Sequence, residues 1–102
     1  MSKTKIPESV AIYGQNVPVI FEPGLTNDKG EEIDGLSSIS EIHINSCCKR
    51  SEHLGILLHE MAHIYFRRNA YVYRDDWDDD LEEQIAEGFA TIIQENFILR
   101  SR

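Results

Sequence analysis

The chain of 102 residues contains few cysteines, and the two it has, Cys47 and Cys48, are neighbours. Neighbouring cysteines rarely form an unstrained disulfide, and two cysteines cannot build a disulfide framework. The pair also lacks the ligand spacing of a structural zinc knuckle. We therefore expect two reduced thiols rather than a disulfide-stabilised or knuckle-type fold.

Long apolar runs are missing as well. No segment approaches the roughly 20 apolar residues that a membrane-spanning helix needs. The N-terminal stretch MSKTKIPESV lacks the apolar middle of a signal peptide. These absences predict a cytoplasmic protein that does not enter a membrane.

Positive charge is scarce. The sequence has 10 Lys and Arg against 18 Asp and Glu, which gives a net charge of −8 at pH 7 with neutral histidines. Much of the negative charge gathers between positions 75 and 83. Such a surface repels nucleic acid phosphates, so we expect no direct binding to DNA or RNA.

The chain also lacks internal repeats, low-complexity tracts and any linker long enough to divide domains. A length of 102 residues suits one domain with a modest core. The apolar share of 41% is enough for a globular fold. We therefore expect residues 1–102 to form a single domain.

The first half of the sequence has β-type patterns. SVAIYG (9–14) and VPVIFE (17–22) are short and rich in β-branched residues, and GQN (14–16) supplies turn chemistry, which predicts a hairpin. Pro18 would fit best on an edge strand or at a strand start. ISEIHINS (39–46) alternates, which predicts a strand with Ile42 and Ile44 facing the core and His43 facing outward.

The second half has helical patterns. Ser51 can cap a helix that runs to about Arg68. Its apolar residues recur at three- and four-residue steps, which predicts one buried face made of Leu54, Leu57, Leu58, Met61, Ala62 and Tyr65. A last helix is expected from about Asp80 to Leu99, with an apolar stripe of Ile85, Phe89, Ile92, Ile93 and Phe97. Strands followed by helices predict an α+β fold.

Two histidines four residues apart lie within the first predicted helix, in the stretch GILLHEMAHIYF (55–66). Residues i and i+4 share a helix face, so His59 and His63 can bind one ion. Catalytic zinc takes three protein ligands and keeps a fourth position for water. Glu60, about 100° around the helix from His59, can reach that water without binding the metal. The alternative is an ordinary solvated helix face, but burying three polar groups without partners is costly, which favours a metal site.

A third ligand must come from elsewhere, and the last helix offers Glu82, Glu83 and Glu87. Glu83 and Glu87 share a face with two alanines that would let the helices approach closely. We assign Glu83 as the third ligand and expect Glu87 to hydrogen-bond the far nitrogen of a ligand histidine. Glu82 is the alternative ligand, and a solvated acidic helix start is the alternative for all three.

The segments HEMAH (59–63) and EQIAEGFA (83–90) together resemble the gluzincin zinc metallopeptidases, and most of all the ImmA/IrrE family. That family follows its HExxH helix with a helix reading roughly E-x-x-A-N-x-F-A, whose first glutamate is the third zinc ligand. The resemblance covers about residues 35–97. It implies a minimal zincin-like domain, in which a small, mostly antiparallel sheet packs beside the HExxH helix and a C-terminal glutamate-bearing helix.

The resemblance also implies an activity. It predicts a zinc-dependent metallopeptidase in which Glu60 acts as general base while a metal-activated water attacks a peptide bond of a peptide or protein substrate. It further implies that the strand 39–46 is a sheet edge bordering the cleft. Glu87 stands where the family has asparagine, which favours the role in orienting a ligand histidine.

A different class of function is compatible with the same residues. The chain could be a zinc-binding interaction module that does not cleave, such as a partner of a phage or toxin–antitoxin regulator. Glu60 argues against this alternative, because a purely structural zinc site would more naturally be closed by four protein ligands.

Other polar residues have weaker claims to a role. Tyr71, Tyr73 or Arg74, in the segment between the two helices, could donate a hydrogen bond to an oxyanion, although an ordinary amphipathic loop is the simpler interpretation. His43 and His53 are expected on the surface.

Overall fold

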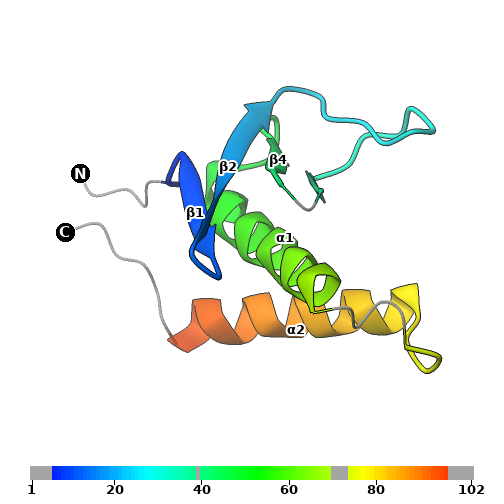
Figure 1. The fold of residues 1–102 in the computed structure, drawn as a ribbon. Coiled ribbons are helices and arrows are strands. Elements are labelled where there is room, and N and C mark those ends of the chain that lie inside the picture. The colour runs from blue at the N-terminus through cyan, green and yellow to red at the C-terminus, as the bar shows by residue number, and fades with distance from the viewer. Residues whose placement is uncertain (1–5, 39, 70–73, 97–102) are drawn as a thin grey trace.

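The structure is a computed structural model that describes residues 6–38, 40–69 and 74–96 (Figure 1). The described residues form an α+β fold, as the sequence predicts, with all of the strands preceding the two long helices. In chain order the elements are β1 (Ser9–Ile12), β2 (Gln15–Glu22), β3 (Gly35–Ser37), β4 (Ile42–Asn45), the 3₁₀ helix η1 (Arg50–Glu52), α1 (His53–Arg68) and α2 (Asp79–Asn96).

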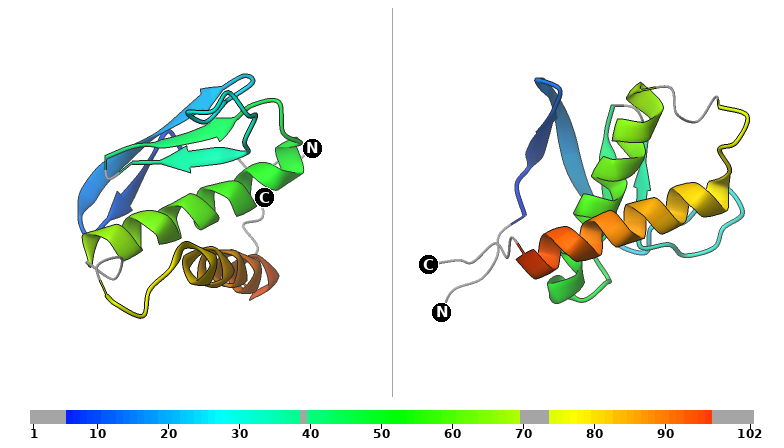
Figure 2. Two further views of the ribbon diagram at one scale, coloured as in Figure 1. Left: turned by 90° about the vertical axis from the view of Figure 1, so that its right-hand side faces the viewer. Right: turned by 90° about the horizontal axis from the view of Figure 1, so that it is seen from below.

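The four strands form one sheet in the order β1-β2-β4-β3. β1 and β3 run antiparallel to their neighbours, whereas β2 and β4 are parallel. The sheet is therefore mixed, with mostly antiparallel pairs. α1 lies across one face of the sheet, and α2 packs on the opposite side of α1 (Figure 2). α1 is thus the middle of three layers.

The predicted hairpin is present, but its turn is not GQN. Tyr13 and Gly14 form the turn, with φ angles of 52° and 76°, and Ile12 pairs with Gln15. Positive φ at both central residues is the signature of the two-residue turn whose twist matches that of the flanking strands. The second strand therefore starts at Gln15, earlier than expected.

Pro18 lies inside β2, opposite Ser9, and β2 is not an edge strand. The amide of Val19 donates to the Glu8 carbonyl at 2.8 Å, toward the β1 side. Successive amides along a strand point to opposite sides, so the nitrogen of Pro18 faces the β4 side. Pairing between β2 and β4 starts at Val19, so the missing N–H of Pro18 falls just before that ladder.

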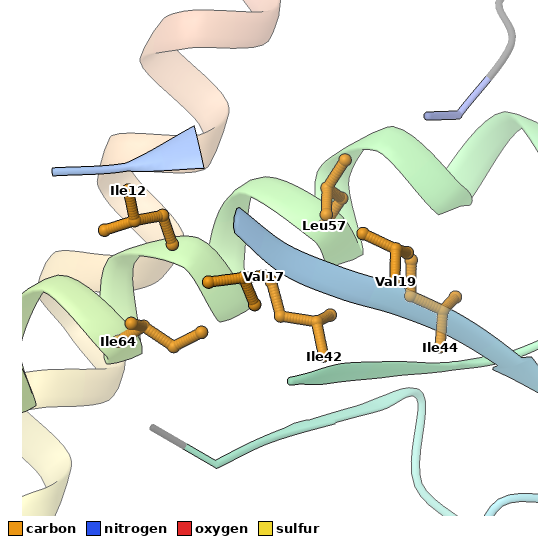
Figure 3. Packing of buried hydrophobic residues seen from close by; sticks show 7 residues of the cluster. All are labelled: Ile12, Val17, Val19, Ile42, Ile44, Leu57 and Ile64. Atoms are coloured by element: carbon orange, nitrogen blue, oxygen red, sulfur yellow. The ribbon is translucent and has the colours of Figure 1, made fainter. Parts of the chain in front are cut away.

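The main core lies between the sheet and α1 (Figure 3). Ile42 and Ile44 are fully buried there, and His43 between them is only partly buried, which confirms the predicted alternation. The other core residues come from the hairpin and from the sheet-facing side of α1: Ile12, Val17, Val19, Leu57 and Ile64.

α1 ends at Arg68, as predicted, but it begins at His53 after the 3₁₀ helix, so Ser51 is not its cap. Two faces of α1 are buried rather than one, because the sheet covers one side and α2 the other. Ala62 and Phe66 form a second, smaller cluster with Ala86 of α2. Tyr65, expected in the buried face, is exposed.

α2 departs most from the sequence prediction. Its side chains Ile85, Phe89 and Ile92 are 40–59% exposed, whereas Ala86 and Ala90 are buried. The helix therefore packs on α1 through its small residues rather than through its apolar stripe. Phe97, the last predicted member of that stripe, lies outside the described residues. Asp78 caps α2, because its Oδ1 accepts a hydrogen bond from the Leu81 amide at 2.7 Å.

Neither helix, over the part of the chain that the structure describes, has the length and apolar character needed to cross a membrane.

Two carboxylates hold His43 on the sheet face away from α1. Its Nδ1 lies 2.9 Å from Glu22 Oε1 and its Nε2 lies 2.9 Å from Glu41 Oε1. The hydrogen bond with Glu41 is the main reason that the pKa of His43 is raised; partial burial opposes the rise, and Glu22 adds to it.

A raised pKa means that protonated His43 stabilises the fold. This contribution is complete below the unfolded-state pKa of about 6.5 and is lost as the pH rises through the folded-state pKa. We expect His43→Gln to lower the free energy of unfolding by about 0.5 kcal/mol at pH about 5, the size of an exposed ion pair, and by less at pH about 8.5. Urea denaturation at both pH values measures this. The double variant Glu22→Gln/Glu41→Gln should reduce the effect, and a loss of equal size at both pH values would contradict it.

Candidate metal centre

α1 and α2 bring His59, His63 and Glu83 together. One potential ligand atom from each residue lies within 4.8 Å of the others. Nε2 of His59 is 3.2 Å from Glu83 Oε2, and Nε2 of His63 is 2.9 Å from Glu83 Oε1. The two imidazole rings are 4.8 Å apart, as expected for residues one helical turn from each other. Both Nε2 atoms therefore converge on one carboxylate.

The far nitrogen of each imidazole also faces a carboxylate. Nδ1 of His59 lies 3.2 Å from Glu87 Oε2, which is the position expected for Glu87. Nδ1 of His63 is hydrogen-bonded to Glu82 Oε2. Glu82, the alternative third ligand, thus lies on the opposite side of the His63 ring from the point where the two Nε2 atoms converge.

Glu82 is a buried anchor between the helices. Its Oε1 accepts a hydrogen bond from Trp77 Nε1 at 3.0 Å, and the Trp77 ring lies 5.0 Å from the Phe66 ring of α1. Burial by itself would raise the pKa of Glu82, but the hydrogen bonds from Trp77 and His63, with the charges of His63 and Arg67, hold it below its usual value. Glu82 is therefore ionised at neutral pH.

Sequence reasoning missed this anchor. The available signal was the lone tryptophan of the chain, placed five residues before a glutamate at a helix start. An indole N–H that becomes buried needs an acceptor, and the nearest carboxylate on the following helix can supply it.

The donor set fits a divalent cation such as zinc. A neutral imidazole carries one N–H, and His59 and His63 each face a carboxylate at both nitrogens. If each Nδ1–H is donated to Glu87 or Glu82, then each Nε2 turns a lone pair toward the oxygens of Glu83, an arrangement that a cation between them stabilises. Tetrahedral zinc, with ligand bonds of about 2.0–2.1 Å, holds its ligand atoms about 3.3 Å apart. The two Nε2 atoms reach different oxygens of Glu83, at 2.9 and 3.2 Å, and one potential ligand atom from each of the three residues lies within 4.8 Å of the others, so the donors are grouped on the scale of a zinc site.

Glu60 is buried beside the donor set, on the side of β3. Its carboxylate lies so close to Gly35 that a Cβ on this glycine would be 3.0 Å from Glu60 Oε2. Burial raises the pKa of Glu60, and the charge of Glu83 adds to the rise. The nearby Ser37 hydroxyl and the charges of His63 and His59 oppose the rise in pKa. Glu60 is thus next to the candidate ligands without belonging to the converging set.

A polar cleft of about 550 Å³ opens onto the site. His59 and His63 are largely buried, whereas the side chains of Glu83 and Glu87 are 60% and 73% exposed. Solvent therefore reaches the point of convergence from the α2 side. The residues that line the cleft include Gly35, His59, Glu60, Glu83, Glu87 and Gln94.

The other candidate residues lie elsewhere. Arg74 forms an exposed ion pair with Asp76, and Tyr71 and Tyr73 fall outside the described residues. His53 Nε2 faces the Cys48 carbonyl at 3.1 Å. Cys47 and Cys48 are free thiols, as predicted. Burial, with help from Asp34, raises the pKa of Cys48 to about 11, so this thiol is a poor nucleophile.

Comparison of the sequence with protein-family models gave no match, and neither did comparison with curated proteins or with solved structures.

The different positions of the three glutamates predict different effects on zinc affinity. Glu83→Ala, like His59→Ala and His63→Ala, should abolish stoichiometric zinc binding because each variant removes a converging atom. Glu82→Gln and Glu87→Gln should weaken binding by about 10–100-fold, because each leaves the ligands in place but loosens one imidazole. Titration with a competing chelator measures the series.

Glu95→Gln, an exposed change on the same helix, is the control and should leave the affinity unchanged. Tight zinc binding by Glu83→Ala together with none by Glu82→Gln would reverse the assignment of these two residues.

Proposed function

We propose that the protein is a zinc-dependent metallopeptidase of the gluzincin type, a minimal zincin-like domain similar to the ImmA/IrrE family. The observation that carries the proposal is the convergence of His59 Nε2, His63 Nε2 and Glu83 at a solvent-accessible point with Glu60 buried alongside. Three protein ligands that leave an open position are typical of catalytic rather than structural zinc.

In this proposal zinc, when bound, polarises the scissile carbonyl and acidifies the attacking water. The chain supplies the proton transfers. Glu60 accepts a proton from the water while the water oxygen attacks the carbonyl carbon. Glu60 then gives that proton to the leaving amine as the C–N bond breaks. Burial raises the pKa of Glu60, which brings it toward neutral pH and suits a group that must both take and return a proton. Glu82 and Glu87 keep the two imidazoles oriented.

The substrate-docking edge must be reassigned. The strand 39–46 was expected to border the cleft, but β4 lies between β2 and β3 and has no open side in the described sheet. β3 is the edge strand on the side of Glu60. Asp34 and Ser38 direct their backbone groups toward β4, because the Asp34 carbonyl accepts from the Asn45 amide and the Ser38 amide donates to the Glu41 carbonyl.

By the alternation of an antiparallel pair, Gly35 then directs its N–H and C=O away from β4. These groups lie at the mouth of the cleft, next to Glu60. An extended peptide could pair with them as an added strand, which would place its backbone near the ligands. Recognition of this kind uses main-chain groups, so we infer a weak sequence preference at this position of the substrate.

Glu60→Gln tests the proposed reaction. The variant should bind zinc and fold like the wild type, yet lose about 10²–10⁴-fold in kcat/KM, because an amide cannot accept the proton. Cleavage of a fluorogenic peptide library, read by mass spectrometry, measures this, with Glu95→Gln as the control.

Undiminished turnover by Glu60→Gln would exclude Glu60 as the base. A zinc-loaded wild type that binds peptides without cleaving any of them would instead favour the non-cleaving interaction module.

Backbone modification of a cleaved peptide tests the docking edge. Methylating the one peptide amide that pairs with the Gly35 carbonyl should raise KM by about tenfold or more, the loss expected when a buried acceptor is left unsatisfied. Methylating the next amide, which points away from β3, should have little effect. A scan of single N-methyl substitutions with no position-dependent change in KM would rule out pairing with β3.

A further inference from the structure

The inner face of β3 is built around the carboxylate of Glu60. Gly35 and Ser37 are two residues apart on the strand, so both face α1. A side chain on Gly35 would meet Ile56 Cγ2 at 2.7 Å and Glu60 Oε2 at 3.0 Å, so the absence of a side chain makes room for the carboxylate. Ser37 is 8% exposed, and its hydroxyl lies close enough to the Glu60 carboxylate to lower the pKa of that group.

A third residue limits the direction in which the Ser37 hydroxyl can donate. Arg67, one turn after His63 on α1, donates from Nη1 to the Ser37 Oγ at 3.0 Å and to the Ser37 carbonyl at 2.9 Å. A guanidinium can only donate, and a serine hydroxyl has a single hydrogen. Because Ser37 Oγ accepts from Arg67, its hydrogen is left for the carboxylate of Glu60. The three side chains form a relay that runs from Arg67 through Ser37 to Glu60.

We propose that Ser37, held by Arg67, is the positioning residue of the general base and aims the Glu60 carboxylate toward the reacting water. This inference rests on the proposed peptidase function. A glutamate side chain has several rotatable bonds, and a base works only within hydrogen-bond reach of the proton it removes. Contacts from β3 limit the positions open to Glu60.

An indirect contact between Arg67 and Glu60 also suits the proposed role of Glu60 as a base. A guanidinium in direct contact with Glu60 would form a charge-assisted pair and compete for the lone pair that must accept the proton. The neutral hydroxyl of Ser37 orients the carboxylate while keeping the Arg67 charge one residue away. The second contact of Arg67, with the Ser37 carbonyl, ties β3 to α1 independently of the hydroxyl.

This second contact makes a sharp experiment possible. Ser37→Ala removes Oγ but keeps the carbonyl that Arg67 binds, so β3 should stay docked on α1. We expect kcat to fall by about 10–100-fold, the cost of a poorly held catalytic group, with KM and zinc content unchanged. Ser37→Thr keeps a hydroxyl and should recover most of kcat. Ser46→Ala, the same change at an exposed position, should match the wild type.

A readout that needs neither zinc nor turnover completes the test. In crystal structures of the metal-free proteins, Glu60 should occupy one position in the wild type and in Ser37→Thr, and more than one in Ser37→Ala. A single unchanged Glu60 position in Ser37→Ala would overturn the proposal, as would an unchanged kcat or a loss confined to KM.

The two proposals fail in different ways. If the zinc-loaded wild type cleaves no peptide, the proposed function fails, and the positions of Glu60 still decide whether Ser37 orients it. If the wild type cleaves and Ser37→Ala cleaves equally well, the peptidase function stands and the positioning role of Ser37 is wrong.

Discussion

The arrangement of the two helices depends on one buried carboxylate. Glu82 lies between α1 and α2, where His63 and Trp77 both bond to it. A buried charge without such partners would cost several kcal/mol, so α2 packs with Glu82 facing α1. Ala86 and Ala90 follow on the same face, one and two turns later, and are buried with it. The next positions around the helix, Glu83 and Glu87, then face His59.

The same constraint concentrates negative charge where a cation could neutralise it. Four carboxylates, those of Glu60, Glu82, Glu83 and Glu87, surround two imidazoles. Part of their mutual repulsion is offset within the protein, because Glu82 and Glu83 lie near the N-terminal end of α2, where the helix dipole favours negative charge. The rest is an excess that a divalent ion would balance. An ion bound there, as proposed, would link the two helices.

Local patterns could be predicted from the sequence, and long-range partners could not. The i, i+4 spacing of His59 and His63 and the alternation around His43 follow from the geometry of a single helix or strand. The predicted burial of the α2 stripe is wrong, because Glu82, Ala86 and Ala90 face α1 instead of the large apolar residues. The edge position that the resemblance implies for the strand 39–46 is also wrong, because strand order depends on pairing with distant segments. Ser37 carries no sequence signal, since its partner Arg67 is 30 residues away.

β3 pairs with β4, offers an open edge and faces Glu60, because the backbone groups and side chains of successive strand residues point in alternating directions. The backbone groups of Asp34 and Ser38, the residues on either side of β3, hold β4, whereas those of Gly35 turn to the open edge where the proposed substrate would pair. Side chains alternate with the same two-residue period but point above and below the sheet, so Gly35 and Ser37 both lie on the side of Glu60. A shift of one residue in the β3–β4 register would turn Leu36 toward the carboxylate and replace a hydroxyl with an apolar group. Correct register at this edge is therefore a condition for the site as well as for the sheet.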